Sequence, residues 1–486
     1  GSESSMSDRK MDEYLRRWKE REEAAEGMVP IIGRLYRERG VIVKVFGDSL
    51  VNKDWIEIIQ SIRLARQILE SRISVLQCLP MLEAIAKLDL GPVRIDLGNL
   101  VTNYEQLTTG ATIDEYVVDV LAPSVTGKKP LRERPQDIVL YGFGRVGRLI
   151  ARIMIGKTGG GDNFRLRAIV VRPGGEDDLE KRASLLRHDS VHGDFHGSIV
   201  LDEEENAMVA NGNMIRVLYA DSPDELDYTR YGIETAILID NTGKWRDEEE
   251  LGQHLKSPGI SEVILTAPGK GSLPNVVYGV NHDEIHTGGP ILSAASCTTN
   301  AIVPILKVVN DRFGIVHGHV ESVHSFTNDQ NLIDNYHAKK RRGRSAALNM
   351  VVTSTGAADA VAKVLPELAD KITGNAIRVP TPNVSLAILQ LDLSEETTVE
   401  ELNHYMRDSS IGGELQNQID YTNSNEVVSS DFVGNRHAAI VDSRATIVAG
   451  RHCVLYVWYD NEFGYARQVV RIVDELAGLG TQTFPL

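Results

Sequence analysis

The fold of this chain follows from one stretch, Asp137-Ile138-Val139-Leu140-Tyr141-Gly142-Phe143-Gly144-Arg145-Val146-Gly147. An apolar run leads into glycines spaced Gly-X-Gly-X-X-Gly, and residues 149–155 follow with a helical pattern. One glycine permits a tight turn, one lets the backbone approach a pyrophosphate, and one lets helix pack on strand. We therefore predict that Gly142, Gly144 and Gly147, with Arg145 and Val146 between them, bind a dinucleotide; the alternative is a purely structural glycine turn.

Outward from this turn the chain alternates strands with helices. Short β-branched runs at 166–171, 235–239 and 263–265 each precede a glycine or proline turn, which predicts a parallel, Rossmann-type α/β domain. From about residue 315 the runs become longer and alternate in polarity, at 318–325, 384–393 and 453–459. We expect a second, more antiparallel sheet there, and hence an α+β domain.

The first 130 residues differ from the rest of the chain in their sequence pattern, which is mainly helical. Apolar residues recur at helical spacing over 7–40, and further helices are predicted at 56–69, 80–88 and 113–121, with Pro80 at a first helical position. Residues 123–135 are predicted to form a linker. We expect a mainly helical extension at 1–130, a Rossmann domain at 131–296, a catalytic domain at 297–460, and a C-terminal segment, 461–486, that returns to the Rossmann domain. Residues 1–5 are interpreted as an expression scar.

Composition narrows the classes of function. The 486 residues carry 52 Lys and Arg against 68 Asp and Glu, a net charge of −16, which argues against nucleic acid as a partner. Hydrophobic residues make up 42%, so the chain is globular rather than disordered. No apolar run nears the roughly 20 residues that span a bilayer, so we expect no membrane partner. Three cysteines fit a reducing compartment, the cytoplasm, and no metal site is predicted.

The end of the second predicted strand bears on the cofactor. NAD-selective sites usually place an acid there to bind the ribose 2′-hydroxyl, whereas this chain has Arg172. Since arginine pairs well with phosphate, we expect NADP to be accepted alongside or in preference to NAD. The alternative is that Arg172 is a solvated loop residue and that an acid from 176–178 folds back.

A candidate nucleophile lies in Ser296-Cys297-Thr298-Thr299-Asn300, between an apolar strand and an apolar helical run. A cysteine at a helix N-terminus is favoured as thiolate by the helix dipole and the free N–H groups. The thiolate needs a basic partner, and His324 follows 27 residues later. The alternative is a buried, unreactive cysteine, which we expect for Cys78 and Cys453.

These motifs, with others in the same order, carry a resemblance. The chain also contains Asp189-Ser190-Val191-His192-Gly193, Thr266-Ala267-Pro268, Val280-Asn281-His282, Ser354-Thr355-Gly356-Ala357, Arg378-Val379-Pro380-Thr381-Pro382-Asn383 and the segment 458–465. From about residue 137 onward it resembles the phosphorylating glyceraldehyde-3-phosphate dehydrogenases. The extension lies outside the resemblance.

The resemblance implies a reaction. Cys297 would attack the aldehyde of a triose phosphate, with His324 as acid and base, and a hydride would pass to NAD or NADP. Inorganic phosphate would then release 1,3-bisphosphoglycerate from the Cys297 thioester, in glycolysis or gluconeogenesis. Asn461 would orient the nicotinamide, and Thr242 and Thr266 would line the cofactor site. A homotetramer is also implied, and His192 and His282 are expected to be structural.

Two phosphate sites are implied as well. Thr327 and Arg378 match ligands of the substrate phosphate. The attacking-phosphate site is matched by Ser296, Thr298, Thr355 and Gly356, with Arg341 as the favoured arginine and Arg342 and Arg344 left open.

One residue, Asp329, departs from the pattern of many glycolytic members and leaves alternative functions open. Many glycolytic members have threonine where Asp329 stands, whereas photosynthetic and gluconeogenic members carry a similar Asp-Gln pair and use NADP more often. Erythrose-4-phosphate dehydrogenase shares that pair and is one alternative, although Thr355-Gly356 fits the triose enzyme better. Another is a non-catalytic scaffold that acts through residues 6–130.

Overall fold

The computed structural model describes residues 2–69 and 71–486. Within them the chain forms two compact units. The N-terminal module comprises the described part of Gly1–Pro135 together with Thr158–Asn163 and Leu479–Leu486, and the main unit comprises Gln136–Lys157 and Phe164–Gly478.

The main unit begins with the Rossmann-type sheet, whose strand order is β11-β10-β9-β4-β5-β8-β7-β6. Strands β11 to β8 pair in parallel and β6 and β7 are antiparallel. The central strand β4 is buried along its whole length, as expected where crossover helices cover both faces. The elements are β4 (Gln136–Tyr141), α6 (Arg145–Gly156), β5 (Phe164–Val171), α7 (Asp178–Arg187), β6 (Ile199–Asp202), β7 (Ala207–Ala210), β8 (Asn213–Tyr219), β9 (Ala236–Asp240), α8 (Glu248–Leu251), β10 (Ile260–Leu265), α9 (Glu284–Thr287) and β11 (Ile291–Ser293).

The second domain of the main unit is built on a mixed sheet in the order β13-β14-β12-β15-β19-β17-β16, with β18 paired to β19. β12 pairs antiparallel with β15, and β15 with β19, so the centre of the sheet is antiparallel as predicted. Its elements are α10 (Cys297–Phe313), β12 (Ile315–Ser325), β13 (Val351–Thr353), α11 (Ala357–Val364), β14 (Ile372–Val379), β15 (Ser385–Leu393), α12 (Val399–Gly412), β16 (Ile419–Thr422), β17 (Ala439–Asp442), β18 (Ile447–Ala449) and β19 (His452–Tyr459).

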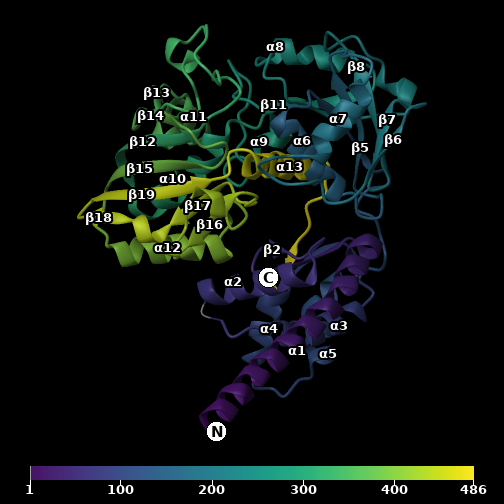
Figure 1. Ribbon diagram of the computed structural model, residues 1–486, viewed down its shortest axis with the longest axis vertical. Coiled ribbons are helices and arrows are strands. Elements are labelled where there is room, and N and C mark those ends of the chain that lie inside the picture. The colour runs from purple at the N-terminus through teal and green to yellow at the C-terminus, as the bar shows by residue number, and fades with distance from the viewer. Residues whose placement is uncertain (1, 70) are drawn as a thin grey trace. The chain divides into compact units, whose positions relative to one another are not determined.

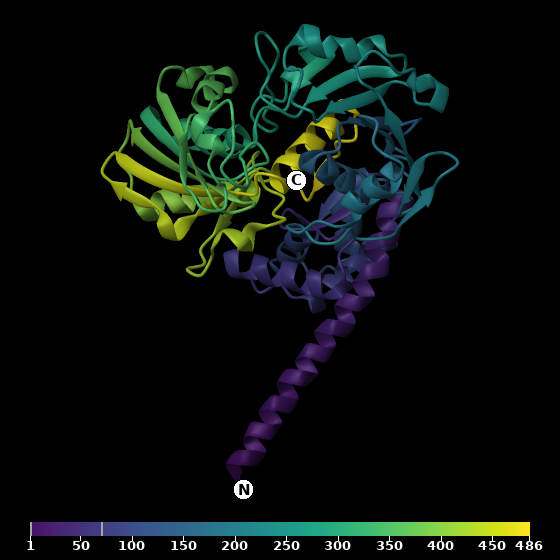
Figure 2. The same ribbon diagram turned by 45° about the horizontal axis from the view of Figure 1, so that its top comes forward.

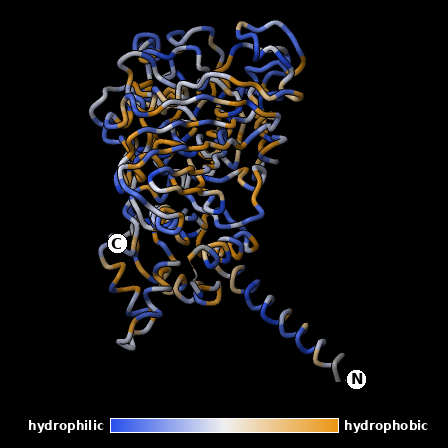
Figure 3. Tube along the Cα trace, turned by 90° about the vertical axis from the view of Figure 1, so that its left-hand side faces the viewer, coloured by the Kyte–Doolittle hydropathy of each residue, from blue (hydrophilic) through white to orange (hydrophobic). Residues whose placement is uncertain are grey.

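Helix α13 (Phe463–Leu476) returns to the Rossmann-type domain and packs against α6 (Figure 1). Strands of both sheets carry the apolar residues of the interior, seen as orange segments in Figure 3. The sequence-predicted boundaries of the Rossmann and catalytic domains stay a prediction.

The N-terminal module is helical with a small sheet in the order β2-β1-β3-β20. Phe484 of β20 is buried in its apolar core, which places the end of the chain in this module. The strands were not predicted, because each is very short. The elements are α1 (Ser2–Arg39), β1 (Val41–Val45), β2 (Asp48–Ser49), α2 (Trp55–Leu69), α3 (Val75–Ala86), β3 (Val93–Asp96), α4 (Leu97–Glu105), α5 (Ile113–Leu121) and β20 (Thr483–Phe484).

One predicted helix start was wrong. Helix α3 begins at Val75, so Pro80 lies inside it rather than at its first position. Ser74 precedes the helix in extended conformation, and Gln77 Oε1 accepts a hydrogen bond from its backbone N–H at 2.9 Å. Because of this local capping contact, the helix begins five residues before the predicted start. Pro80, which has no backbone N–H, leaves one hydrogen bond of the helix unformed.

Candidate active site

The thiol of Cys297 stands at the first residue of α10. Ser296 is the N-cap, and its Oγ accepts a hydrogen bond from the Thr299 N–H at 3.0 Å. The preceding Ala295 has a left-handed backbone, φ +58°, a conformation that costs a non-glycine residue about 1–3 kcal/mol. Its carbonyl accepts a 2.7 Å hydrogen bond from the buried Tyr465 Oη. The turn that presents the thiol is therefore held from both sides.

His324, near the end of β12, faces this thiol. Its Nε2 lies 3.5 Å from Cys297 Sγ, and its Nδ1 lies 2.7 Å from the Ser325 carbonyl oxygen. Because a carbonyl only accepts, Nδ1 carries the proton and the Nε2 lone pair points at the sulfur. Burial lowers the pKa of His324, which keeps the imidazole neutral and able to accept a proton.

Cys297 itself is partly buried. Burial raises the pKa of Cys297, while hydrogen bonding at Thr298 and the charge of Arg378 oppose that rise. The free N–H groups at the start of α10 also favour the thiolate. His324 Nε2, 3.5 Å away, is placed where it can accept the thiol proton.

Cationic side chains lie beside this pair. Arg378 is on β14, directly paired with His324 of β12, and its Nη1 donates to Thr327 Oγ1 at 2.7 Å. Burial, and then the charge of Arg342, lower the pKa of Arg378. Arg342 Nη2 donates to Thr353 Oγ1 at 3.3 Å, and Thr353 is on β13, the strand that pairs with the Arg378 strand β14. Two neighbouring cations that include a partly buried one form a site suited to phosphate.

The structure distinguishes the arginines that the sequence left open. Arg342 is largely buried, and its Nη1 lies 2.8 Å from Asp329 Oδ2; its Nε has no hydrogen-bond partner among the described residues. Arg341 and Arg344 are exposed, and Arg341 Nη1 donates to the Val352 carbonyl. The burial and the ion pair of Arg342 therefore favour Arg342, and not Arg341 as expected from the sequence, as the candidate arginine of the attacking-phosphate site.

Asp329 takes part in this cluster. Although partial burial opposes it, the hydrogen bond from Arg342 holds the pKa of Asp329 below its usual range. The carboxylate is compensated by Arg342, which it orients, and so the repulsion of phosphate expected from an ionised acid at this position is reduced.

Hydroxyl groups and a helix N-terminus complete the surroundings. Thr298 Oγ1 lies 2.9 Å from the Oη of buried Tyr459, which lies 2.8 Å from Ser322 Oγ. Thr355 Oγ1 accepts from the Ala357 N–H, and Gly356 is the N-cap of α11 with open space where a Cβ would stand. The sequence singled out Thr298, Thr355 and Gly356, but it contained no signal for Tyr459 as the support of Thr298.

Asn461 is fixed by two serines. Its Oδ1 accepts hydrogen bonds from Ser325 Oγ and Ser385 Oγ, each at 2.9 Å. Both acceptor directions are occupied, so the amide N–H₂ is the group presented to a ligand. The two serines were not predicted, because they come from strands β12 and β15, distant in the sequence.

The glycine turn has the form that a dinucleotide requires. Gly142 has φ +94°, and a Cβ on Gly147 would stand 2.8 Å from the Gly142 carbonyl oxygen. A Cβ on Gly144 would meet open space at the N-terminus of α6. The free backbone N–H groups at a helix N-terminus suit a phosphate.

The other predicted cofactor residues surround this turn. Thr242 N–H and Oγ1 both donate to the buried Asp240, and Thr266 Oγ1 donates to the Asp240 carbonyl. The Arg145 side chain pairs with Asp189 and Glu462 instead of facing outward. Arg145 and Val146 can therefore contribute their backbone N–H groups.

Arg172 is exposed directly after β5. Of the acids that could have taken its place, Asp178 is buried and accepts from Tyr219 Oη at 2.8 Å and from Arg182 Nε at 3.2 Å. Glu176 and Asp177 are exposed.

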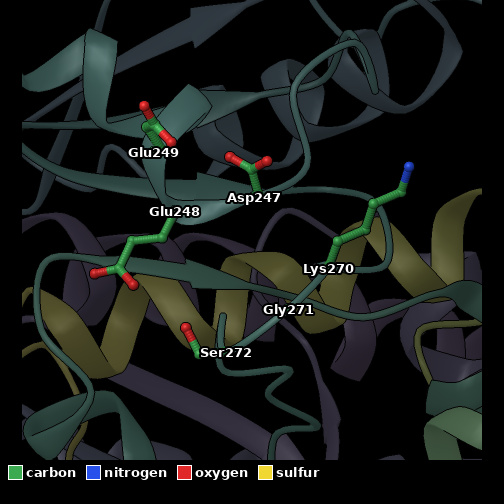
Figure 4. Close-up of a pocket in the computed structure, with 6 residues that line it drawn as sticks. All are labelled: Asp247, Glu248, Glu249, Lys270, Gly271 and Ser272. Carbon is green, nitrogen blue, oxygen red and sulfur yellow. The ribbon is translucent and has the colours of Figure 1, made fainter.

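A further hollow of about 390 Å³ lies elsewhere in the Rossmann-type domain, lined by Asp247, Glu248, Glu249, Lys270, Gly271 and Ser272 (Figure 4). It shares no residue with the site above, and its three carboxylates disfavour an anionic ligand. Among the described residues no three His, Cys, Asp or Glu side chains gather as a metal site, and no helix has the length and apolarity to cross a bilayer.

The main unit thus combines a glycine turn in a parallel sheet with a domain that presents a thiol–imidazole pair. Residues 136–248 match the NAD binding domain of glyceraldehyde 3-phosphate dehydrogenase, and residues 296–461 match its C-terminal domain. The chain therefore belongs to the glyceraldehyde-3-phosphate dehydrogenase family.

Individual relatives agree. The chain is 58% identical over 461 residues to a glyceraldehyde-3-phosphate dehydrogenase-like protein of Pseudomonas aeruginosa, covering 94% of this chain and 100% of that protein. It is 39% identical to glyceraldehyde-3-phosphate dehydrogenase 2 of Trichormus variabilis, over 70% of this chain and 98% of the relative. The chloroplastic glyceraldehyde-3-phosphate dehydrogenase A of Zea mays is 40% identical over 70% of this chain and 82% of its own length. The first match is long enough to take in most of the N-terminal module.

Proposed function

We propose that this chain oxidises glyceraldehyde 3-phosphate to 1,3-bisphosphoglycerate with NAD or NADP and inorganic phosphate. The observation that carries the proposal is the 3.5 Å approach of Cys297 Sγ to the unprotonated Nε2 of His324, beside the Arg378 and Arg342 cations. This combination supplies a nucleophile, a base and an anion site together.

In the proposed mechanism His324 Nε2 accepts the thiol proton as Cys297 Sγ bonds to the aldehyde carbon, and the proton passes to the carbonyl oxygen. His324 takes the hydroxyl proton back as the C–H bond breaks, leaving a thioester on Cys297. When bound, the nicotinamide accepts the hydride. Phosphate then attacks the thioester carbon, and the Cys297 thiolate leaves with the C–S electrons.

We propose that Arg378 and Thr327 hold the substrate phosphate. Arg342, Ser296, Thr298, Thr355 and Gly356 are assigned to the attacking phosphate, with Arg342 in place of the Arg341 favoured from the sequence. The support for Arg342 is its burial, its pairing with Asp329 and its unpartnered Nε among the described residues.

For the cofactor, we propose that backbone N–H groups at Gly144, Arg145 and Val146 hold the pyrophosphate and that Asn461 orients the nicotinamide. Arg172 is proposed to accept the 2′-phosphate of NADP. What supports this role is its exposure after β5, together with the engagement of Asp178 by Tyr219 and Arg182.

We also propose that the chain assembles as a homotetramer. One segment of the catalytic domain supports assembly, because five large apolar or aromatic side chains within 20 residues of it are exposed: Leu332, Ile333, Tyr336, Leu348 and Met350. Such concentrations of large apolar side chains mark interaction sites.

The test is initial-rate nicotinamide reduction with glyceraldehyde 3-phosphate in four wells, containing NAD or NADP, each with and without phosphate. We expect phosphate-dependent turnover in the wild type and none in Cys297→Ser, while cofactor binding by the variant stays near wild type. Turnover with erythrose 4-phosphate but not with the triose would favour the tetrose enzyme. Absence of turnover with both aldehydes would favour the scaffold role.

A further inference from the structure

Helix α1 packs against the rest of the N-terminal module mainly through its C-terminal half. Its C-terminal half is buried through Ala25, Met28, Ile32 and Leu35. Its N-terminal half extends away from the other helices of the module (Figure 2). There Met11, Tyr14, Leu15 and Trp18 are 56%, 59%, 52% and 41% exposed, although they are large and mostly apolar.

The exposed residues continue the seam that packs inside the module. Met11, Trp18, Ala25 and Ile32 recur every seven residues, and a second series three residues later runs Tyr14, Arg21, Met28 and Leu35. This is the a/d spacing with which one helix packs along another. The later half of the seam meets α3, whereas the earlier half, over 7–22, has the same spacing with most of its surface bare.

The charges beside the bare seam decide which kind of helix fits it. One edge carries Lys10 and Arg17, each directly before a seam residue, and the other edge carries Asp8 and Glu22. Two antiparallel copies would bring the basic edges together. Two parallel copies would bring the basic edge of each against the acidic edge of the other, with Arg17 facing the second copy's Glu22.

We propose that residues 7–22 of α1 pair in parallel with the same segment of a second copy of this chain. Within residues 7–22 the seam consists of Met11, Tyr14, the outer side of Trp18 and Arg21, with Leu15 at its edge. The Trp18 ring also contacts Trp55 at a centroid distance of 6.2 Å. An isolated segment this short would be a marginal helix, but here the docked half of α1 already holds it helical. The other side of the helix, where Arg16 pairs with Glu13 and Glu20, stays in water, and Arg17 Nε pairs with Glu13 Oε1 at 3.0 Å within the same helix.

A cysteine cross-linking experiment on the full chain tests this arrangement. In a Cys297→Ser background, Met11→Cys places a thiol in the seam, and Arg9→Cys places one on the opposite side of the same exposed helix. Under mild oxidation we expect about tenfold more disulfide-linked dimer from Met11→Cys, because a parallel pair holds identical seam residues together. Equal yields would overturn the proposal. Far-UV circular dichroism and thermal melting of both variants check that the module stays folded.

Two further measurements test the orientation. Arg17→Glu should reduce Met11→Cys cross-linking at low salt, and adding Glu22→Arg should restore it, since the exchange rebuilds the contact between copies. An unchanged yield in Arg17→Glu would contradict the charge argument. Cross-linking that occurs only when Met11→Cys and Arg21→Cys chains are mixed would show an antiparallel pair and overturn the parallel one.

Discussion

Arg341 and Arg342 are adjacent in the chain and occupy opposite environments. The Arg342 side chain is largely buried, pairs with Asp329 and acts on the charge of Arg378. The Arg341 side chain is exposed and donates a hydrogen bond to the Val352 carbonyl. We expect Arg342→Ala to raise the KM for phosphate by about tenfold or more, because a hydrogen bond to a charged group contributes about 1.5–3 kcal/mol. Arg341→Ala is the matched control and should leave that KM near wild type, and steady-state kinetics with varied phosphate measure both.

The control has a second use. If Arg341→Ala raises the KM for phosphate while Arg342→Ala does not, the sequence-based preference for Arg341 stands and the assignment to Arg342 fails.

Arg172 is exposed, and its proposed role depends on a contact with the 2′-phosphate of NADP. Arg172→Ala should weaken NADP binding by about tenfold or more relative to NAD if a charge-assisted contact to the 2′-phosphate is lost. Fluorescence titration with each cofactor measures the two dissociation constants. A parallel loss for NAD and NADP would return Arg172 to the solvated loop.

Helices α6 and α13 are joined by a buried ionic network. Arg145 on α6 pairs with Asp189 and Glu462, and Glu462, just before α13, also lies 3.1 Å from His192 Nε2. Although burial opposes it, hydrogen bonds from His192 and Arg145 hold the pKa of Glu462 below its usual range. A carboxyl group with a depressed folded pKa stabilises the fold above its unfolded pKa of about 4.3, and this contribution is lost as pH falls through the folded pKa.

Glu462→Gln should therefore destabilise the main unit at pH 7 by about 1–3 kcal/mol, because Arg145 loses a charged partner in a partly buried position. The difference from wild type should shrink as the pH falls below the unfolded pKa of about 4.3 and through the lower folded pKa, where the wild-type carboxyl group becomes protonated. Urea unfolding at several pH values measures this trend. A difference that stays constant across the range would show that the charge of Glu462 contributes nothing.

At the scale of the whole molecule, the C-terminal segment folds into the N-terminal module. β20 pairs in parallel with β3, and Phe484 is buried in the N-terminal module, whereas Leu486 is exposed. Phe484→Ala should destabilise the module by about 3–5 kcal/mol through loss of burial and the cavity left behind. Hydrogen exchange of the β3 amides reports the opening, with Leu486→Ala as the control. Unchanged protection in Phe484→Ala would mean that the C-terminal strand is not required by the module.

Much of the fold was predictable because its signals are local. The helix at 113–121 coincides with α5 since its periodicity and its Thr112 cap lie within a few residues. The glycine turn was recognisable because only glycine accepts φ +94° at Gly142 and the close approach at Gly147. β1 and β3 escaped prediction because a strand of four or five residues is defined by its neighbours, and one of these is the C-terminal β20.

The sequence alone determined which chemical groups this protein carries and the local turns that present them: Cys297 after its Ser296 cap, His324 near a strand end, and the glycines before α6. Tertiary structure decided which groups meet. It paired His324 with Arg378 across two strands, turned Arg342 rather than Arg341 inward, set Tyr459 behind Thr298, and closed the N-terminal module with Phe484. The reason is that spacing and capping act over a few residues, whereas burial, ion pairing and strand register join segments far apart in the chain.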